Sequence, residues 1–161
     1  MSLKEYTFSY TEFDNDSLLN KQDQLLLAKA RKITAQAYAP YSDFFVGAAA
    51  LLSNKEIITA TNQESASFPA GLCAERVLLS AITALHPKSK IKTIAISYDN
   101  KHGESNHPVS PCGICRQSLA DYEARQTHPI RLILSGLKGK VFVIKSASLL
   151  LPLSFSAKDL L

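Results

Sequence analysis

Three cysteines are the residues of this 161-residue chain whose type and spacing could do chemistry. Cys112 and Cys115 form a C-x-x-C pair at the start of one predicted helix, and Cys73 begins another. Helix N-termini offer partial positive charge and free amides, which favour the thiolate, the form that binds metal. An odd number of cysteines cannot all pair within one chain, and without a visible export signal we expect reduced thiols. Metal binding is therefore the leading interpretation.

Zinc is the metal that best fits a set of thiolates, and we expect one Zn²⁺ per subunit. A structural zinc site needs four protein ligands, whereas three cysteines leave the fourth position open for water, as catalysis requires. The four histidines stand at no compelling spacing from the cysteines, and we expect exposed or turn positions for them: His86, His102, His107 and His128. His107, five residues before Cys112, comes nearest to an exception.

Glu75 is the candidate acid and base of this site. Residues two apart in a regular helix point about 200° away from each other, so Cys73 must precede the helix if both side chains are to share a site. Glu75 would then take a proton from the water and deliver it elsewhere. The alternative is that Glu75 only complements the helix dipole, as first-turn acids often do.

Two arginines are predicted to support the metal. Three thiolates on a divalent ion leave a net negative charge, which weakens the ion as an acid. Arg76 follows Cys73 by three residues, and Arg116 directly follows Cys115, so both are placed to donate hydrogen bonds to the sulfurs. Either arginine could instead be a surface residue.

The elements that must position these residues alternate along the chain. Helical spacing of apolar residues predicts helices at 20–39, 74–85 and 113–125. Short apolar or β-branched runs predict strands at 44–52, 56–61, 91–98, 130–134 and 141–144, the first two and the last two as hairpins. The order predicts one α/β layered domain with a mixed sheet over residues 1–161, with an extension at 1–17 and a tail at 150–161.

Composition favours an ordinary globular domain, with 46% apolar and 20% charged residues. The net charge of +4 comes from lysines interspersed with acids, which indicates a solvated surface and no nucleic-acid partner. Residues 1–17 carry four acids and no apolar segment, unlike a secretory signal. The longest uncharged apolar run, at 44–52, is too short to span a bilayer. We expect a cytoplasmic protein with no membrane partner.

The motifs C-A-E-R at 73–76 and P-C-G-I-C-R-Q at 111–117 resemble the zinc signature of the small, homotetrameric cytidine deaminases. Three further segments resemble that family in the expected order: A-P-Y-S-D-F-F-V-G-A-A at 39–49, N-Q-E-S-A-S-F-P-A-G-L at 62–72 and L-L-P-L-S-F at 150–155. The resemblance implies a three-layer α/β/α fold with a mixed five-stranded sheet. It also implies a homotetramer whose sites are completed by neighbouring subunits.

The same resemblance implies hydrolysis of cytidine, and of deoxycytidine, to uridine or deoxyuridine plus ammonia in pyrimidine salvage, with Glu75 shuttling protons. The positions that match the family's substrate-binding residues are Phe44 for the base, Asn62 and Glu64 for the ribose hydroxyls, the backbone of Ala74 for the amide edge of the pyrimidine, and Phe155 for a neighbouring subunit's site. Plain core or turn roles remain open for these residues.

Two positions depart from the family's pattern, because Phe68 stands where tyrosine is frequent and Ser65 where asparagine is common. The loop at 99–110 also looks long. A rival interpretation is a deaminase for a cytosine-containing antibiotic such as blasticidin S, although the Asn62-x-Glu64 pair favours a ribose. A nucleic-acid-editing deaminase or RNA-binding module would need a basic groove with interleaved aromatics, which is not visible. A structural zinc domain would need a fourth ligand.

Overall fold

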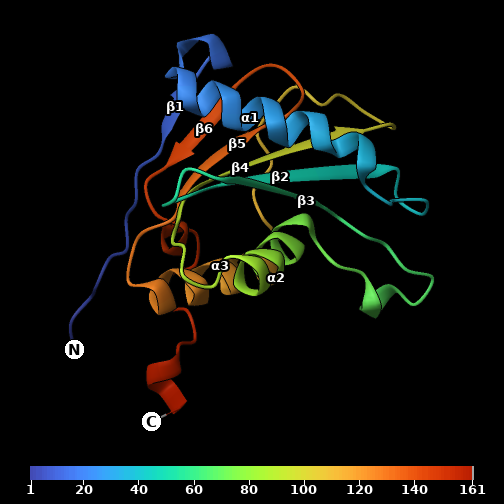
Figure 1. The fold of residues 1–161 in the computed structure, drawn as a ribbon. Coiled ribbons are helices and arrows are strands. Elements are labelled where there is room, and N and C mark those ends of the chain that lie inside the picture. The colour runs from blue at the N-terminus through green and yellow to red at the C-terminus, as the bar shows by residue number, and fades with distance from the viewer. Residues whose placement is uncertain (161) are drawn as a thin grey trace.

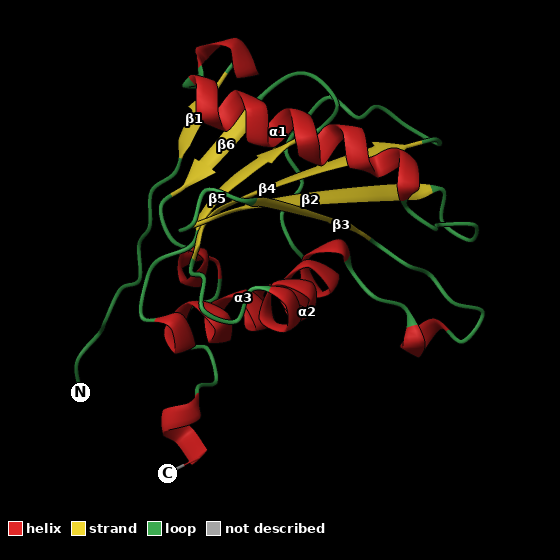
Figure 2. Cartoon of the chain, in the orientation of Figure 1, coloured by secondary structure: helices red, strands yellow, loops and turns green. Residues whose placement is uncertain are grey.

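A six-stranded mixed sheet lies between two helical layers in the computed structural model, which describes residues 1–160 (Figure 1). In sheet order the strands are β1 (Thr11–Phe13), β6 (Val141–Ile144), β5 (Arg131–Ser135), β4 (Ile91–Asn100), β2 (Phe44–Leu52) and β3 (Ile57–Thr61). The helices are α1 (Lys21–Ile33), α2 (Ala74–Leu85) and α3 (Gly113–Gln126). Helix α1 covers one face of the sheet, and α2 and α3 cover the other (Figure 2), which confirms the three-layer α/β/α prediction. Within residues 1–160, none of the helices has both the length and the apolarity to cross a membrane.

The prediction of five strands was wrong by one, because β1 lies inside the N-terminal extension. It pairs antiparallel with β6, with Thr11 opposite Val143 and Phe13 opposite Val141. Three residues are too few to show an alternating pattern in a sequence. The strand forms because its backbone groups pair with the edge of β6, and because Phe13 packs on the core beneath α1.

The other predicted elements are present, with two differences. Strand β4 runs to Asn100, two residues into the loop predicted at 99–110, and the first helix ends early. The hairpins β2–β3 and β5–β6 are antiparallel, whereas β4 and β5 are parallel, which makes the sheet mixed. Helix α1 ends at Ile33 and is followed by a short 3-10 turn, so it is shorter than the predicted 20–39. The Thr34 hydroxyl donates to the Arg31 carbonyl at 2.8 Å, a local bond that competes with continued helix.

Helix α1 is fixed to the sheet at its N-terminus by polar contacts. The Asn20 side chain caps the helix by accepting from the Asp23 amide at 3.0 Å. Asp23 is buried, and its carboxylate accepts hydrogen bonds from both Nη atoms of Arg131 at 2.7 Å each. Arg131 is the first residue of β5. A bidentate pair of this kind fixes orientation as well as distance.

Two apolar cores hold the layers together, one on each face of the sheet. The larger core joins α2 and α3 to the sheet through residues such as Leu78, Ile82 and Leu119. On the opposite face α1 approaches β2 so closely that a Cβ at Gly47 would lie 2.2 Å from the Ala30 carbonyl oxygen. The chain thus sets α2 and α3 beside each other on one face, and both helices begin next to the same pocket.

Candidate metal and substrate site

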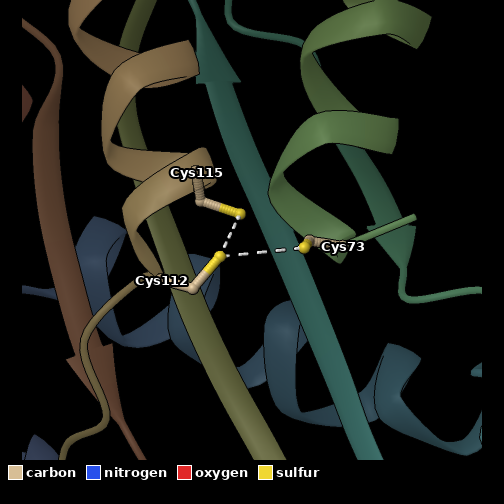
Figure 3. A group of neighbouring side chains, drawn as sticks. All are labelled: Cys73, Cys112 and Cys115. Carbon is tan, nitrogen blue, oxygen red and sulfur yellow. Dashed lines mark hydrogen bonds between the residues drawn. The ribbon is translucent and has the colours of Figure 1, made fainter. Parts of the chain in front are cut away.

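The three cysteine side chains point toward one another from the starts of α2 and α3 (Figure 3). Cys73 and Cys112 are the residues that directly precede the two helices, and Cys115 lies in the first turn of α3. Their Sγ atoms are 4.0 Å apart for Cys73 and Cys112 and 3.5 Å apart for Cys112 and Cys115, and all three lie within 4.8 Å of one another. The sequence prediction that these thiols share one site agrees with this arrangement.

The cluster has the dimensions and chemistry of a zinc site. Thiolates bound at about 2.3 Å in tetrahedral geometry lie about 3.8 Å apart, close to the separations seen here. Among residues 1–160 the group that could hold a metal consists of the three cysteines alone. The histidines make contacts elsewhere: His86 with Glu56, His102 with Asp43, His107 with Tyr98 and His128 with the Pro129 carbonyl. Three protein ligands with one open position are the donor set of a catalytic zinc ion.

The electrostatics of the thiols also favour a bound cation. Hydrogen bonding from the Cys115 thiol lowers the pKa of Cys73 to about 6 against the opposing effect of burial, and the Cys112 thiol and the Arg76 charge lower it further. Hydrogen bonding to Cys73, then burial, raises the pKa of Cys115. When no metal is bound, these hydrogen bonds therefore favour ionisation of Cys73 and oppose ionisation of Cys115. A divalent cation would allow all three to ionise.

Glu75 is buried beside this cluster, with only 5% of its surface exposed. Helix α2 begins at Ala74, and Cys73 has extended backbone, with φ −71° and ψ 149°. The predicted break before the helix is therefore present, and both Cys73 and Glu75 line the same pocket. Burial is the main reason that the pKa of Glu75 is raised, and the negative charge of Cys73 adds to it, while the Glu75 amide and the Cys115 thiol oppose it by hydrogen bonding. A carboxyl group in this environment is suited to carry a proton.

The two arginines take different places. Arg76 is close enough to Cys73 for its charge to lower the pKa of that thiol. Arg116 instead donates from Nε to the Pro111 carbonyl at 2.8 Å and from Nη1 to the Leu150 carbonyl at 3.2 Å. Arg116 therefore fixes the loop that precedes Cys112. Hydrogen bonds from either arginine to the sulfurs stay a prediction.

A pocket of about 500 Å³ opens next to the cluster. Besides the cysteines and Glu75, its walls include four residues expected to bind substrate: Phe44, Asn62, Glu64 and Ala74. Phe68, one of the positions that departs from the family's pattern, also lines it. Residues from β2, from the segment after β3 and from the starts of two helices thus converge on one cavity.

Asn62 and Glu64 are held by the backbone around the pocket. The Asn62 side chain accepts from the Val46 amide at 2.7 Å and donates to the Phe44 carbonyl at 2.9 Å, which ties it to β2. Glu64 accepts from the Tyr41 amide at 2.8 Å and from the hydroxyl and amide of Ser42. Burial opposes ionisation of Glu64, but these hydrogen bonds outweigh it and lower its pKa.

Phe155 lies away from the pocket of its own chain. It is 59% exposed, and its carbonyl accepts from the Gln117 side chain at 2.8 Å. The C-terminal tail extends beyond α2 and α3 on the side away from the sheet (Figure 1). Its predicted place in a neighbouring subunit's site stays a prediction.

Sequence reasoning missed several pocket residues, among them Ile96, Tyr98 and Val109. Tyr98 lies on β4, only 3% exposed, with its ring stacked on Phe44. The alternation along β4 places Ile96 and Tyr98 on one face of the sheet, which was the available signal. The pairing of β4 with β2, which brings Tyr98 to Phe44, could not be obtained from the sequence of β4 alone.

Comparison with known proteins agrees with this fold and site. The family model described as the cytidine and deoxycytidylate deaminase zinc-binding region matches residues 20–128. The cytidine deaminase of Halalkalibacterium halodurans is 36% identical over 137 residues, which cover 85% of this chain and 96% of that protein. The crystal structure of cytidine deaminase from Burkholderia pseudomallei superposes with a TM-score of 0.69 at 32% identity, over 81% of this chain and 97% of that one.

The fold, the three-thiol cluster and the neighbouring carboxyl group define a zinc-dependent deaminase. The chain belongs to the cytidine and deoxycytidylate deaminase zinc-binding family. It is also similar to the blasticidin-S deaminase of Bacillus cereus, at 27% identity over 140 residues that cover 86% of this chain and 95% of that protein.

Proposed function

We propose that this protein deaminates cytidine, and deoxycytidine, by hydrolysis to uridine or deoxyuridine and ammonia, as a step of pyrimidine salvage. The observation that carries this proposal is the convergence on one pocket of a three-thiol cluster, a buried carboxyl group and the Asn62–Glu64 pair. The similarity to proteins named cytidine deaminase supports it. Cys73, Cys112 and Cys115 would hold the zinc ion.

Glu75 is the proton carrier in this proposal. When bound, zinc would supply the Lewis acidity that lowers the pKa of a water molecule, so that the water can lose a proton and act as a nucleophile at neutral pH. Glu75 takes a proton from that water and gives it to N3 of the pyrimidine as the oxygen bonds to C4. It then carries the second proton from the added hydroxyl to the 4-amino nitrogen, the C4–N bond breaks and ammonia leaves. One carboxyl group can do both steps because it ends each cycle in the form in which it began.

The rest of the pocket would orient the nucleoside. Phe44 offers ring surface to the base, and the backbone of Ala74 lies beside Glu75 for the amide edge of the pyrimidine. Asn62 uses one amide hydrogen on the Phe44 carbonyl, which leaves the second for a ribose hydroxyl. The ionised Glu64 carboxylate retains lone pairs for a second hydroxyl. Together these groups favour a substrate that carries both a pyrimidine and a sugar.

We expect cytidine to be turned over in preference to cytidine monophosphate. Of the described residues that line the pocket, none is lysine, arginine or histidine, and Glu64 adds a negative charge. Repulsion of a phosphate should lower kcat/KM for the monophosphate by about 10- to 100-fold relative to cytidine. Initial rates on cytidine, deoxycytidine, free cytosine, cytidine monophosphate and blasticidin S measure this directly. Equal rates on the monophosphate would overturn the substrate assignment.

The same comparison decides the second candidate, deamination of blasticidin S, which the similarity to the Bacillus cereus enzyme favours. Free cytosine is expected to be a poor substrate, because it cannot engage Asn62 and Glu64. A faster rate on blasticidin S than on cytidine would assign the antibiotic instead.

We further propose that the active form is a homotetramer and that the tail at 150–161 completes a neighbouring site. The exposure of Phe155 outside the pocket of its own chain supports this arrangement. The cytoplasmic location expected from the sequence remains a prediction.

A further inference from the structure

We propose that Tyr98 is a positioning residue that holds Phe44 in the orientation in which it receives the pyrimidine. The inference rests on the proposed function and deepens it, because it adds a residue that acts on the substrate through another side chain. Tyr98 belongs to neither of the motifs at 73–76 and 111–117, nor to the other segments that resemble the family.

The contact between the two rings is the first observation. The centroids of Phe44 and Tyr98 are 5.0 Å apart and their planes differ by 10°, so the rings stack in parallel. The strand register explains the contact, because Val46 lies opposite Tyr98 and Phe44 is the diagonal neighbour on the same face of the sheet. Offset stacking at this distance is an attractive geometry for aromatic pairs.

Tyr98 is itself held by the loop that joins β4 to α3, at 101–112. Its hydroxyl donates to the Glu104 carbonyl at 3.4 Å and lies 3.2 Å from Nδ1 of His107, whose ring meets the Tyr98 ring edge-on. Ser105 anchors this loop to strand β4, because its Oγ accepts a hydrogen bond from the Asn100 amide at 2.8 Å. The loop thus supplies a backing for Tyr98 that does not depend on substrate.

The loop is in turn packed tightly on the β5–β6 turn. A Cβ at Gly136 would lie 2.2 Å from the Ser105 carbonyl oxygen, and one at Gly139, which has φ +82°, would lie 2.0 Å from the Asn106 carbonyl oxygen. Glycine at both positions allows this close approach of two backbones. The packing of this loop therefore has a consequence at the site, because the loop places a fixed support behind Tyr98.

Tyr98 covers one face of the Phe44 ring, and Phe44 also lines the pocket. A ring that is already oriented loses less side-chain freedom when a base packs on it, so binding is stronger without any change in the reacting groups. Tyr98 is buried, and the chemistry-bearing residues Glu75 and the cysteines belong to other elements. Loss of the stack should consequently raise KM and affect kcat much less.

The test is a double-mutant cycle on the zinc-loaded protein with Tyr98→Leu, Phe44→Leu and the double variant. Tyr98→Leu is expected to raise KM for cytidine about 3- to 10-fold, which corresponds to the free energy measured for aromatic pairs. The same change should leave kcat within about twofold of the unmodified protein. In the Phe44→Leu background the same change should alter KM less than about twofold, because the ring that Tyr98 positions is absent. Dissociation constants for uridine, measured by calorimetry, should follow the same pattern without any turnover.

Tyr122→Leu is the matched control, since Tyr122 is also a buried tyrosine but lies on α3, outside the pocket. It should change thermal stability and leave KM as in the unmodified protein. Additive effects of the Tyr98 and Phe44 changes on KM and on uridine binding would overturn the inference. If the unmodified protein turned over no cytidine, the proposed function would fail instead, so the two failures are distinguishable.

Discussion

Replacing Glu75 by glutamine is expected to lower kcat for cytidine by about 100- to 10,000-fold, the usual contribution of a positioned acid and base. Glutamine has nearly the same shape but cannot accept and release protons at neutral pH. Because Glu75 belongs to no part of the three-thiol cluster, the zinc content should stay at one ion per chain. Stopped or continuous assays of uridine formation, with metal analysis of the same sample, check both halves of this expectation.

Glu56→Gln provides the matched control for this experiment. Glu56 pairs with His86 at the surface and does not line the pocket. The substitution makes the same change of charge as Glu75→Gln. Its turnover should equal that of the unmodified protein. A Glu75→Gln enzyme that works at the normal rate would remove Glu75 as the proton carrier and leave the zinc site without an assigned acid and base.

Cys115→Ala is expected to have the second large effect, on metal content and therefore on activity. The Cys115 sulfur lies 3.5 Å from that of Cys112, and the side chain is buried. Among residues 1–160 the possible metal ligands that gather here are the three cysteines alone, so the alanine variant has no replacement for the lost ligand. Zinc affinity should fall by more than about 100-fold. Mutation of residues that only hydrogen-bond to a metal ligand already lowers metal affinity by about 10- to 100-fold, and loss of the ligand itself should cost more. Deamination should be lost with the metal.

Metal analysis after dialysis measures this loss, with Ser118→Ala as the control on the same helix. The Ser118 hydroxyl donates a hydrogen bond to the Ile114 carbonyl of the same helix, so its removal should leave one zinc per chain. Full zinc content and normal turnover in Cys115→Ala would show that the three-thiol cluster is not the catalytic metal site.

The sequence was informative where local rules act. The starts of α2 and α3 could be placed within a residue, because apolar periodicity and the following breaks identify helices of this length. That placement put Cys73 just before its helix and Glu75 inside it, which is the arrangement found. The strands β2 and β6 likewise begin and end at the predicted residues.

Contacts between distant segments could not be predicted in the same way. Strand β1 forms because β6 offers an edge about 130 residues later in the chain, not because three residues carry a strand pattern. Arg116 follows a cysteine in the sequence, yet its guanidinium turns to the carbonyls of Pro111 and Leu150. Tyr98 reaches Phe44 only through the pairing of β4 with β2. Each of these outcomes is decided by tertiary packing.

The most direct test of the account is the stoichiometry of ammonia and uridine released from cytidine by the zinc-loaded protein. Hydrolysis of the C4–N bond predicts one ammonia for each uridine formed, loss of the reaction when a chelator removes zinc, and recovery when zinc is returned. Absence of ammonia from cytidine with one zinc bound per chain, or turnover that continues at full rate in the metal-free protein, would contradict it.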